Sequence, residues 1–194
     1  MFLGFDLDGV IADLEGPLRK YFLENYSHDI DTRPRTFKIR VPGLKDSKVW
    51  DVIHEFLSHQ SRIPPYPEAP QVLRAFYDLS GFPLYFLTAR KEKFREETVQ
   101  WIKRNIDVPF SLEMCASGSD KCRLLPEHIA HFVEDRLRTA NELAEAGIKT
   151  FLVNRPWNQD RQTHPDVTRV DDLLEVYMLT APMICAKRAG AANV

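Results

Sequence analysis

Two aspartates, Asp6 and Asp8, end a short apolar run and are followed by Gly9. Side chains two residues apart on a strand point to the same face, so this spacing places two carboxylates side by side. Such a pair repels itself at neutral pH unless a proton or a cation compensates, and its hard oxygen atoms suit Mg²⁺. A calcium loop of the EF-hand type is excluded, because its fifth, sixth and twelfth positions would be Val10, Ile11 and Pro17.

Further polar groups also follow apolar runs. Thr88 and Ala89 come after residues 84–87, and Asp135 comes after residues 132–133 and Glu134. The Thr88 hydroxyl and the backbone N–H groups that follow it could hold an anion, although Thr88 could equally cap a helix. Lys121 begins a helical pattern, where it could neutralise a phosphate or a carboxylate, or be an ordinary solvated lysine. Asp135 would supply a third carboxylate to the pair at the first strand.

The elements that must position these groups alternate along the chain. Helical spacing of apolar residues occurs in residues 14–26, 46–57, 72–79, 94–106, 124–129, 137–146 and 171–179. Short apolar runs predict strands at residues 2–7, 84–87, 110–114, 132–133 and 150–153. This alternation predicts an α/β fold, a Rossmann-like three-layer core whose parallel sheet is covered on both faces. Such sheets bind ligands outside the carboxyl ends of their strands, so the polar groups belong at one edge.

A helical segment interrupts the alternation after the first strand. The prolines within residues 63–67 exclude helix and mark its end. We therefore predict a core domain of residues 1–13 and 68–180, a helical insert of residues 14–67, and a frayed C-terminal tail of residues 181–194.

The order of these motifs resembles that of the haloacid dehalogenase (HAD) superfamily. The motifs are Asp6-Leu7-Asp8-Gly9-Val10, Leu87-Thr88-Ala89-Arg90, Lys121 and Glu134-Asp135. The resemblance covers residues 1 to about 153 and implies a HAD-like fold and metal-dependent phosphoryl transfer. It implies that Asp6 is the nucleophile and that Asp8 is the general acid, which argues for phosphate chemistry and against the dehalogenase branch.

The resemblance also implies a set of ligands. Mg²⁺ would be held by the Asp6 carboxylate, the Asp8 backbone carbonyl and Asp135, while the phosphoryl oxygens would be held by Thr88, Ala89 and Lys121. The sequence departs from the commonest pattern by having Glu134-Asp135 in place of two aspartates. The choice between these two neighbours as the direct metal ligand stays open.

In this superfamily an insert at residues 14–67 is a cap that selects the substrate. Its size, together with residues 132–136 and 154–158, is similar to the 5'(3')-deoxyribonucleotidases and their bacterial nucleotidase-like relatives, which implies a nucleoside monophosphate substrate. Arg90, Glu134, Asn154 and Arg155 are then candidates for contact with the substrate or for support of the site. The aromatic residues of the insert could form its own core or stack on a base: Phe22, Tyr26, Phe37, Trp50, Phe56 and Tyr66. A basic stretch could meet a second anion or be a solvated loop: Arg33, Arg35, Lys38 and Arg40.

Composition limits the partners. The 194 residues carry 26 Lys+Arg against 28 Asp+Glu, a formal charge of −2, which argues against an extended nucleic acid as a partner but not against a small phosphorylated one. With no basic leader, no long apolar stretch and three cysteines without paired spacing, we expect a cytoplasmic protein that does not enter a membrane. The oligomeric state is left open.

Two other functions are kept as alternatives. The first is a phosphatase for sugar phosphates or other small phosphomonoesters, or for a nucleic-acid end. The second is a binding or regulatory protein that has lost turnover.

Overall fold

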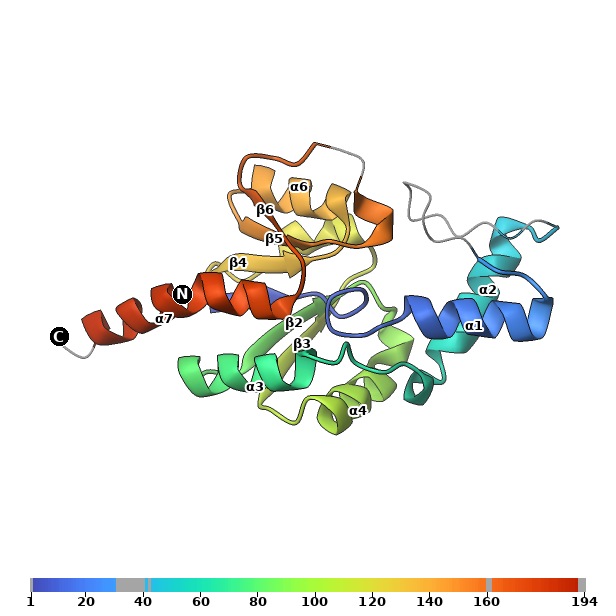
Figure 1. Ribbon diagram of the computed structural model, residues 1–194, viewed down its shortest axis with the longest axis horizontal. Helices are drawn as coiled ribbons and strands as arrows, with labels where there is room; N and C mark the ends of the chain where they lie inside the picture. Colours follow the sequence, from blue (N-terminus) through green and yellow to red (C-terminus); the bar gives the residue numbers. More distant parts are fainter. Residues whose placement is uncertain (1, 31–40, 42, 160–161, 192–194) are drawn as a thin grey trace.

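One parallel sheet organises the computed structural model, which describes residues 2–30, 41, 43–159 and 162–191 (Figure 1). The strand order is β3-β2-β1-β4-β5-β6, and every neighbouring pair is parallel. The strands are β1 (Phe2–Phe5), β2 (Leu84–Thr88), β3 (Phe110–Met114), β4 (Ile129–Glu134), β5 (Lys149–Val153) and β6 (Val167–Val170). This confirms the predicted α/β fold with a parallel sheet. The order reverses between β1 and β4, and this switch point is where open sheets of this kind bind ligands.

The helices follow the predicted periodicity with two corrections. They are α1 (Glu15–Tyr26), α2 (Asp46–Leu57), α3 (Ala69–Ser80), α4 (Arg95–Asn105), α5 (Lys121–Leu124), α6 (Leu137–Glu145) and α7 (Leu173–Ala191), with 3₁₀ turns η1 (Gln60–Arg62), η2 (Glu92–Phe94), η3 (Gly118–Asp120) and η4 (Pro156–Asn158). The helix predicted at residues 124–129 is wrong, because Pro126 forces Leu125 into an extended conformation and α5 ends before it. The C-terminal segment predicted to be frayed is helical through Ala191, and Ile184 within it is buried.

β6 was not predicted from the sequence. Only its two end residues, Val167 and Val170, are buried, and the two between them are polar. It is an edge strand that pairs with β5 alone. So short an apolar signal does not stand out from a loop.

The two faces of the sheet carry separate apolar clusters. Phe5 and Val133 belong to the larger cluster, which also contains buried residues of α3, α4 and α7. Phe132, next to Val133 on β4, lies in a different cluster with Leu143 of α6. Successive strand residues therefore enter opposite helical layers, as a parallel sheet with both faces covered requires.

The helices α1 and α2 lie together beyond one end of the sheet (Figure 1). Phe22 and Phe56 are buried, and the ring centroids of Tyr21 and Phe56 are 5.4 Å apart. Phe22 and Phe56 therefore pack in the protein interior and belong to the same apolar cluster as Phe5. Phe37 and the basic stretch of residues 33–40 lie outside the described residues. In the described part of the chain, no helix combines the length and apolar character needed to cross a bilayer.

Candidate functional site

Asp6 lies directly after β1, at the switch point of the sheet. Its backbone N–H donates to the carbonyl of Val133 on β4, at 2.9 Å. The Leu7 N–H donates to Asp6 Oδ1 at 2.8 Å, and Lys121 Nζ lies 2.7 Å from Asp6 Oδ2. Both carboxylate oxygens of Asp6 are therefore fixed by the fold, and the side chain is only 8% exposed.

Lys121 joins Asp6 to Glu134. Its Nζ also lies 2.7 Å from Glu134 Oε2, and both side chains are buried. The other oxygen of Glu134, Oε1, accepts the Arg136 N–H at 3.1 Å. Glu134 therefore uses both carboxylate oxygens to hold protein groups, one of which is the Lys121 ammonium.

Asp135 is held differently. Its Oδ2 accepts the indole N–H of Trp157 at 2.8 Å, and its backbone carbonyl accepts from Asn158 Nδ2 at 2.7 Å. Gly9 approaches this carboxylate closely, since a Cβ built on Gly9 would lie 2.2 Å from Asp135 Oδ2. Gly9 also has φ of 79°, in the left-handed region that favours glycine. The glycine of the first motif therefore lets the first loop lie against the Asp135 carboxylate.

The acids at this edge form a buried cluster. Carboxylate oxygens of Asp6, Glu134 and Asp135 lie within 4.8 Å of one another, and all three residues are buried. Burial, and then the neighbouring acid Glu134, raise the pKa of Asp6 to about 7, although Lys121 opposes this shift. Burial and the neighbouring Glu134 and Asp6 likewise raise the pKa of Asp135 well above its usual range.

Lys121 responds in the opposite sense. Burial alone would lower the pKa of Lys121, but Asp6 and Glu134 outweigh burial and raise it. One lysine faces three carboxylates, so the ionised cluster has an excess of negative charge. A divalent cation with a preference for oxygen ligands fits this donor set, because it favours ionised carboxylates at a buried site.

Asp8, which is partly exposed, makes an ion pair with the buried Arg90. Arg90 Nε lies 2.9 Å from Asp8 Oδ2, and Arg90 NH2 lies 2.6 Å from Asp8 Oδ1. The third guanidinium nitrogen, NH1, donates to Gln60 Oε1 at 2.6 Å. Arg90 therefore contacts the second aspartate of the first motif and the 3₁₀ turn η1 at the same time.

Thr88 ends β2, the strand that pairs with β1 on the other side from β4. Its hydroxyl oxygen accepts the Arg90 N–H at 3.2 Å, and its carbonyl accepts the Cys115 N–H at 2.9 Å. Ala89 is partly exposed and lines the cavity described below. Two of the predicted phosphate-binding residues, Thr88 and Ala89, thus lie at the end of the strand that pairs with β1.

Asn154 and Arg155 follow β5 but face protein groups. Asn154 Nδ2 donates to Asp171 Oδ1 at 2.7 Å. Arg155 Nε donates to the Gly9 carbonyl at 2.7 Å, and its guanidinium lies 3.9 Å from the ring centroid of Tyr66. Asn154 therefore braces the loop after β6, and Arg155 braces the loop that carries the first motif.

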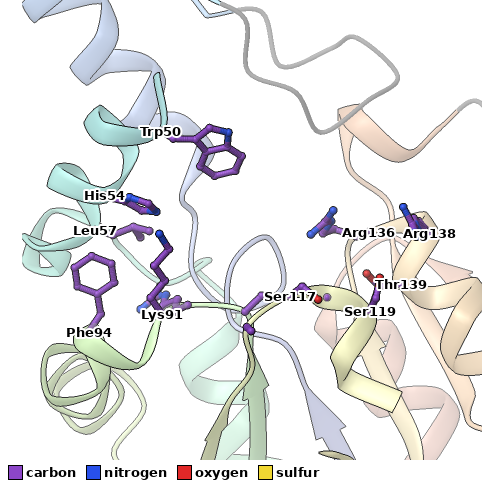
Figure 2. A pocket seen from close by; sticks show the side chains of 14 residues that line it. Trp50, His54, Leu57, Lys91, Phe94, Ser117, Ser119, Arg136, Arg138 and Thr139 are labelled. Atoms are coloured by element: carbon purple, nitrogen blue, oxygen red, sulfur yellow. The ribbon is translucent and has the colours of Figure 1, made fainter. Parts of the chain in front are cut away.

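A cavity of about 620 Å³ separates α2 from the carboxyl edge of the sheet. Figure 2 shows Trp50, His54 and Phe94 on one side, and Arg136 and Arg138 on the other. No acidic residue is among the described residues that line it, which are Trp50, His54, Leu57, Ala89, Arg90, Lys91, Phe94, Ala116, Ser117, Gly118, Ser119, Arg136, Arg138 and Thr139. The cavity therefore has one wall with aromatic side chains and Lys91, and an opposite wall with Arg136 and Arg138.

The rings of the aromatic wall form a row. The centroids of Trp50 and His54 are 6.2 Å apart, and those of His54 and Phe94 are 6.3 Å apart. Trp50 is 50% exposed, unlike Phe22 and Phe56 of the insert, which are buried. Burial, and then Lys91 and Lys93, lower the pKa of His54, so its imidazole is neutral at neutral pH. Of the three rings, Trp50 is the one whose apolar surface is largely exposed, since Phe94 is buried and Lys93 lies over its ring.

Sequence reasoning missed several contacts of this site. Gln60 carries no motif, and its role depends on a hydrogen bond to Arg90, thirty residues away. Trp157 and Asn158 lie in a loop expected near the active edge, but their contacts with Asp135 were not predicted. For these two residues the position after β5 was the available signal, and for Gln60 there was none.

Comparison with known proteins gave matches at the level of structure. No family model matches the chain, and no curated protein matches it in sequence. CbbY from Rhodobacter sphaeroides, in complex with phosphate, superposes with a TM-score of 0.58 at 17% identity over 90% of this chain and 95% of that one. A HAD family hydrolase from Deinococcus radiodurans R1, with bound phosphate and sodium, superposes with a TM-score of 0.60 at 15% identity, over 94% of this chain and 96% of that one. An L-2-haloacid dehalogenase superposes with a TM-score of 0.56 at 14% identity, over 92% of this chain and 98% of that one. The chain therefore has the fold of the haloacid dehalogenase-like hydrolases.

Proposed function

We propose that this protein is a Mg²⁺-dependent phosphomonoesterase in which Asp6 is the nucleophile. The observation that carries the proposal is the buried cluster at the switch point, where Lys121 contacts both Asp6 and Glu134 and Asp135 lies beside them. A carboxylate that attacks a phosphate monoester meets electrostatic repulsion, which a lysine and a metal ion must offset. Phosphate bound to two of the structural neighbours supports this chemistry.

The Asp6 carboxylate, the Asp135 carboxylate and the Asp8 backbone carbonyl would hold the magnesium ion. Between the two neighbouring acids, we assign the metal to Asp135, because Lys121 and the Arg136 N–H contact the two oxygens of Glu134, whereas the Asp135 carboxylate accepts the Trp157 N–H through Oδ2. When bound, the ion would neutralise charge on the cluster and on the phosphoryl group.

The reaction divides into two displacements. In the first, an oxygen of Asp6 attacks phosphorus, the bond between phosphorus and the alcohol oxygen breaks, and Asp8 gives that oxygen a proton. In the second, water gives a proton to Asp8 and attacks the phosphorus of the aspartyl phosphate, which restores Asp6 and releases inorganic phosphate. Lys121, the Thr88 hydroxyl and the Ala89 N–H would hold the phosphoryl oxygens throughout.

Asp8 favours phosphate esters over haloacids as substrates. An alkoxide leaving group needs a proton, whereas a halide does not. A carboxylic acid in the second position of the first motif supplies a group that can give this proton. The dehalogenase among the structural neighbours shows that the fold also supports other chemistry, so the experiment must include it.

The substrate that the cavity suits best is a nucleoside monophosphate. The half-exposed Trp50 offers a stacking surface for a base, and Arg136 and Arg138, the latter paired with Glu142, lie on the opposite wall. A volume of about 620 Å³ is within the usual range for small-molecule sites. Sugar phosphates remain the alternative class, since they need no aromatic wall.

Product release from a substrate panel tests the proposal, with phosphate measured for the phosphate esters and chloride for 2-chloropropionate. The panel contains nucleoside monophosphates, ribose 5-phosphate, p-nitrophenyl phosphate and 2-chloropropionate, each with and without Mg²⁺. Asp6→Asn is the matched variant, because it keeps the shape of the side chain and removes the nucleophile. We expect phosphate release that requires both Mg²⁺ and Asp6, and fastest release from nucleotides. Equal turnover by Asp6→Asn would refute the nucleophile, and faster turnover of ribose 5-phosphate would refute the nucleotide preference alone.

A further inference from the structure

Like Lys121, Arg90 directs its nitrogen atoms to protein partners at the carboxyl edge of the sheet, but its partners are Asp8 and Gln60. Its side chain is 1% exposed. Two of its nitrogen atoms contact the two oxygens of Asp8, and the third contacts Gln60. Although Arg90 lines the cavity, all three guanidinium nitrogens are engaged, so it is poorly placed to bind a substrate phosphate.

The paired geometry fixes the plane of the Asp8 carboxylate. Two parallel N–H···O contacts between a planar guanidinium and a carboxylate restrict rotation, which a single contact from a lysine does not. Asp8 itself is 22% exposed, so part of the carboxylate still reaches solvent at the edge of the site. Arg90 therefore sets the direction in which Asp8 presents its oxygens.

Arg90 is in turn held in place from several sides. Gln60 is buried, accepts from Arg90 NH1 and donates through Nε2 to Thr98 Oγ1 on α4 at 3.0 Å. The Arg90 guanidinium lies 5.7 Å from the centroid of Trp101, whose indole N–H donates to the Ile63 carbonyl at 2.7 Å. Gln60 and Ile63 belong to the segment that leads from α2 back to the core. The position of that segment is thereby linked to Asp8 through one arginine.

We propose that Arg90 is a positioning residue for the general acid Asp8, and that Gln60 holds Arg90 in the orientation this requires. This inference rests on the proposed function, because it needs Asp8 to give a proton to the leaving alcohol. If the general acid is misoriented, bond cleavage slows far more for a leaving group that needs a proton than for one that does not. A purely structural role would affect both kinds of leaving group equally.

Two aryl phosphates of similar size make this distinction measurable. Phenyl phosphate releases a strongly basic phenolate, and p-nitrophenyl phosphate releases a weakly basic one. The rate at which phenol or p-nitrophenol is released in the first turnover, with Mg²⁺ present, isolates the step in which Asp8 gives its proton. The quantity of interest is the rate with p-nitrophenyl phosphate divided by the rate with phenyl phosphate.

Four variants are compared with the unchanged protein. Arg90→Lys keeps the positive charge and loses the paired geometry. Gln60→Leu keeps both the arginine and the aspartate in the sequence and removes the hydrogen bond from Arg90 to Gln60. Arg95→Lys is the matched control, since Arg95 makes a similar paired contact with Glu92 away from Asp8. Asp8→Asn shows how far the ratio moves when the acid itself is lost.

We expect Arg90→Lys to raise the ratio at least about tenfold, a fraction of the 10²–10⁴ that general acid catalysis contributes. Gln60→Leu should raise it less, and Arg95→Lys should not change it. Arg90→Lys that slows both esters equally, or leaves the ratio unchanged, overturns the inference. If Arg90→Lys does not fold, an unchanged ratio in Gln60→Leu overturns it. A ratio that does not change in Asp8→Asn instead contradicts the proposed role of Asp8, so the two failures are distinguishable.

Discussion

The neighbouring acids Glu134 and Asp135 should respond differently to the loss of a single charge. Glu134 has both oxygens engaged, by Lys121 Nζ at 2.7 Å and by the Arg136 N–H at 3.1 Å. Asp135 uses Oδ2 to accept from Trp157 at 2.8 Å. We therefore predict that Asp135→Asn weakens the response to Mg²⁺, while Glu134→Gln weakens catalysis at saturating Mg²⁺.

The size of the Glu134 effect follows from its contacts. A glutamine has one acceptor oxygen, so it can keep the Lys121 contact or the Arg136 contact, but not both. A hydrogen bond to a charged group is worth about 1.5–3 kcal/mol, which corresponds to about 10- to 150-fold. We expect Glu134→Gln to lower kcat/KM by that factor and to leave the Mg²⁺ concentration at half-maximal activity within about twofold.

Asp135→Asn should instead raise the Mg²⁺ concentration at half-maximal activity by at least about tenfold, because a ligand charge is lost. Its fold should persist, since burial and neighbouring acids already raise the pKa of Asp135 and an amide removes that repulsion. The assay is a Mg²⁺ titration of phosphate release, with thermal unfolding as the check on folding. Asp171→Asn is the matched control, because Asp171 follows β6 and contacts Asn154 outside the cluster. A shifted midpoint in Glu134→Gln together with a normal one in Asp135→Asn would refute our assignment of the ligand.

Three further changes test other parts of the site. Gly9→Ala should lower the free energy of unfolding by about 1–2 kcal/mol, because Gly9 has a left-handed φ. It should also weaken the rise in melting temperature that Mg²⁺ causes, because the new Cβ would meet the Asp135 carboxylate. An unchanged Mg²⁺ effect by calorimetry would contradict the second expectation. In the absence of divalent cations, the raised pKa of Asp6 makes its contribution to stability greatest below about pH 4, and this contribution is lost as the pH rises through about 7. We therefore expect the melting temperature to fall between these pH values, and Mg²⁺ or Asp6→Asn to reduce the fall. A melting temperature that rises over this range would refute the assigned burial of Asp6. Trp50→Ala should lower kcat/KM for nucleotides about 5- to 150-fold, which corresponds to a stacking energy of about 1–3 kcal/mol, and should change kcat/KM for ribose 5-phosphate little. The control is Leu23→Ala, at another exposed apolar residue of the insert. Equal losses of kcat/KM on both substrates would argue against base stacking.

The sequence determined the order of the core elements and the edge at which the polar motifs meet. Strand and helix periods are local properties, so residues 84–87 and 150–153 could be assigned to strands from their own composition. The rule that parallel strands present their carboxyl ends at one edge then placed Asp6, Thr88 and Asp135 together. Where the local signal was short or mixed with polar residues, as in β6 and residues 124–129, the prediction was incomplete or wrong.

Only the tertiary structure decided which partner each charged side chain takes. Arg90 contacts Asp8 across 82 residues of sequence, and Arg155 contacts Gly9 across 146. Glu134 and Asp135 are neighbours of similar chemistry, yet one holds Lys121 and the other receives Trp157. Such choices depend on where a side chain points after distant segments have packed, and on how far burial strengthens one contact over another. Periodicity and spacing carry no information on either, because both describe only residues that are close in the chain.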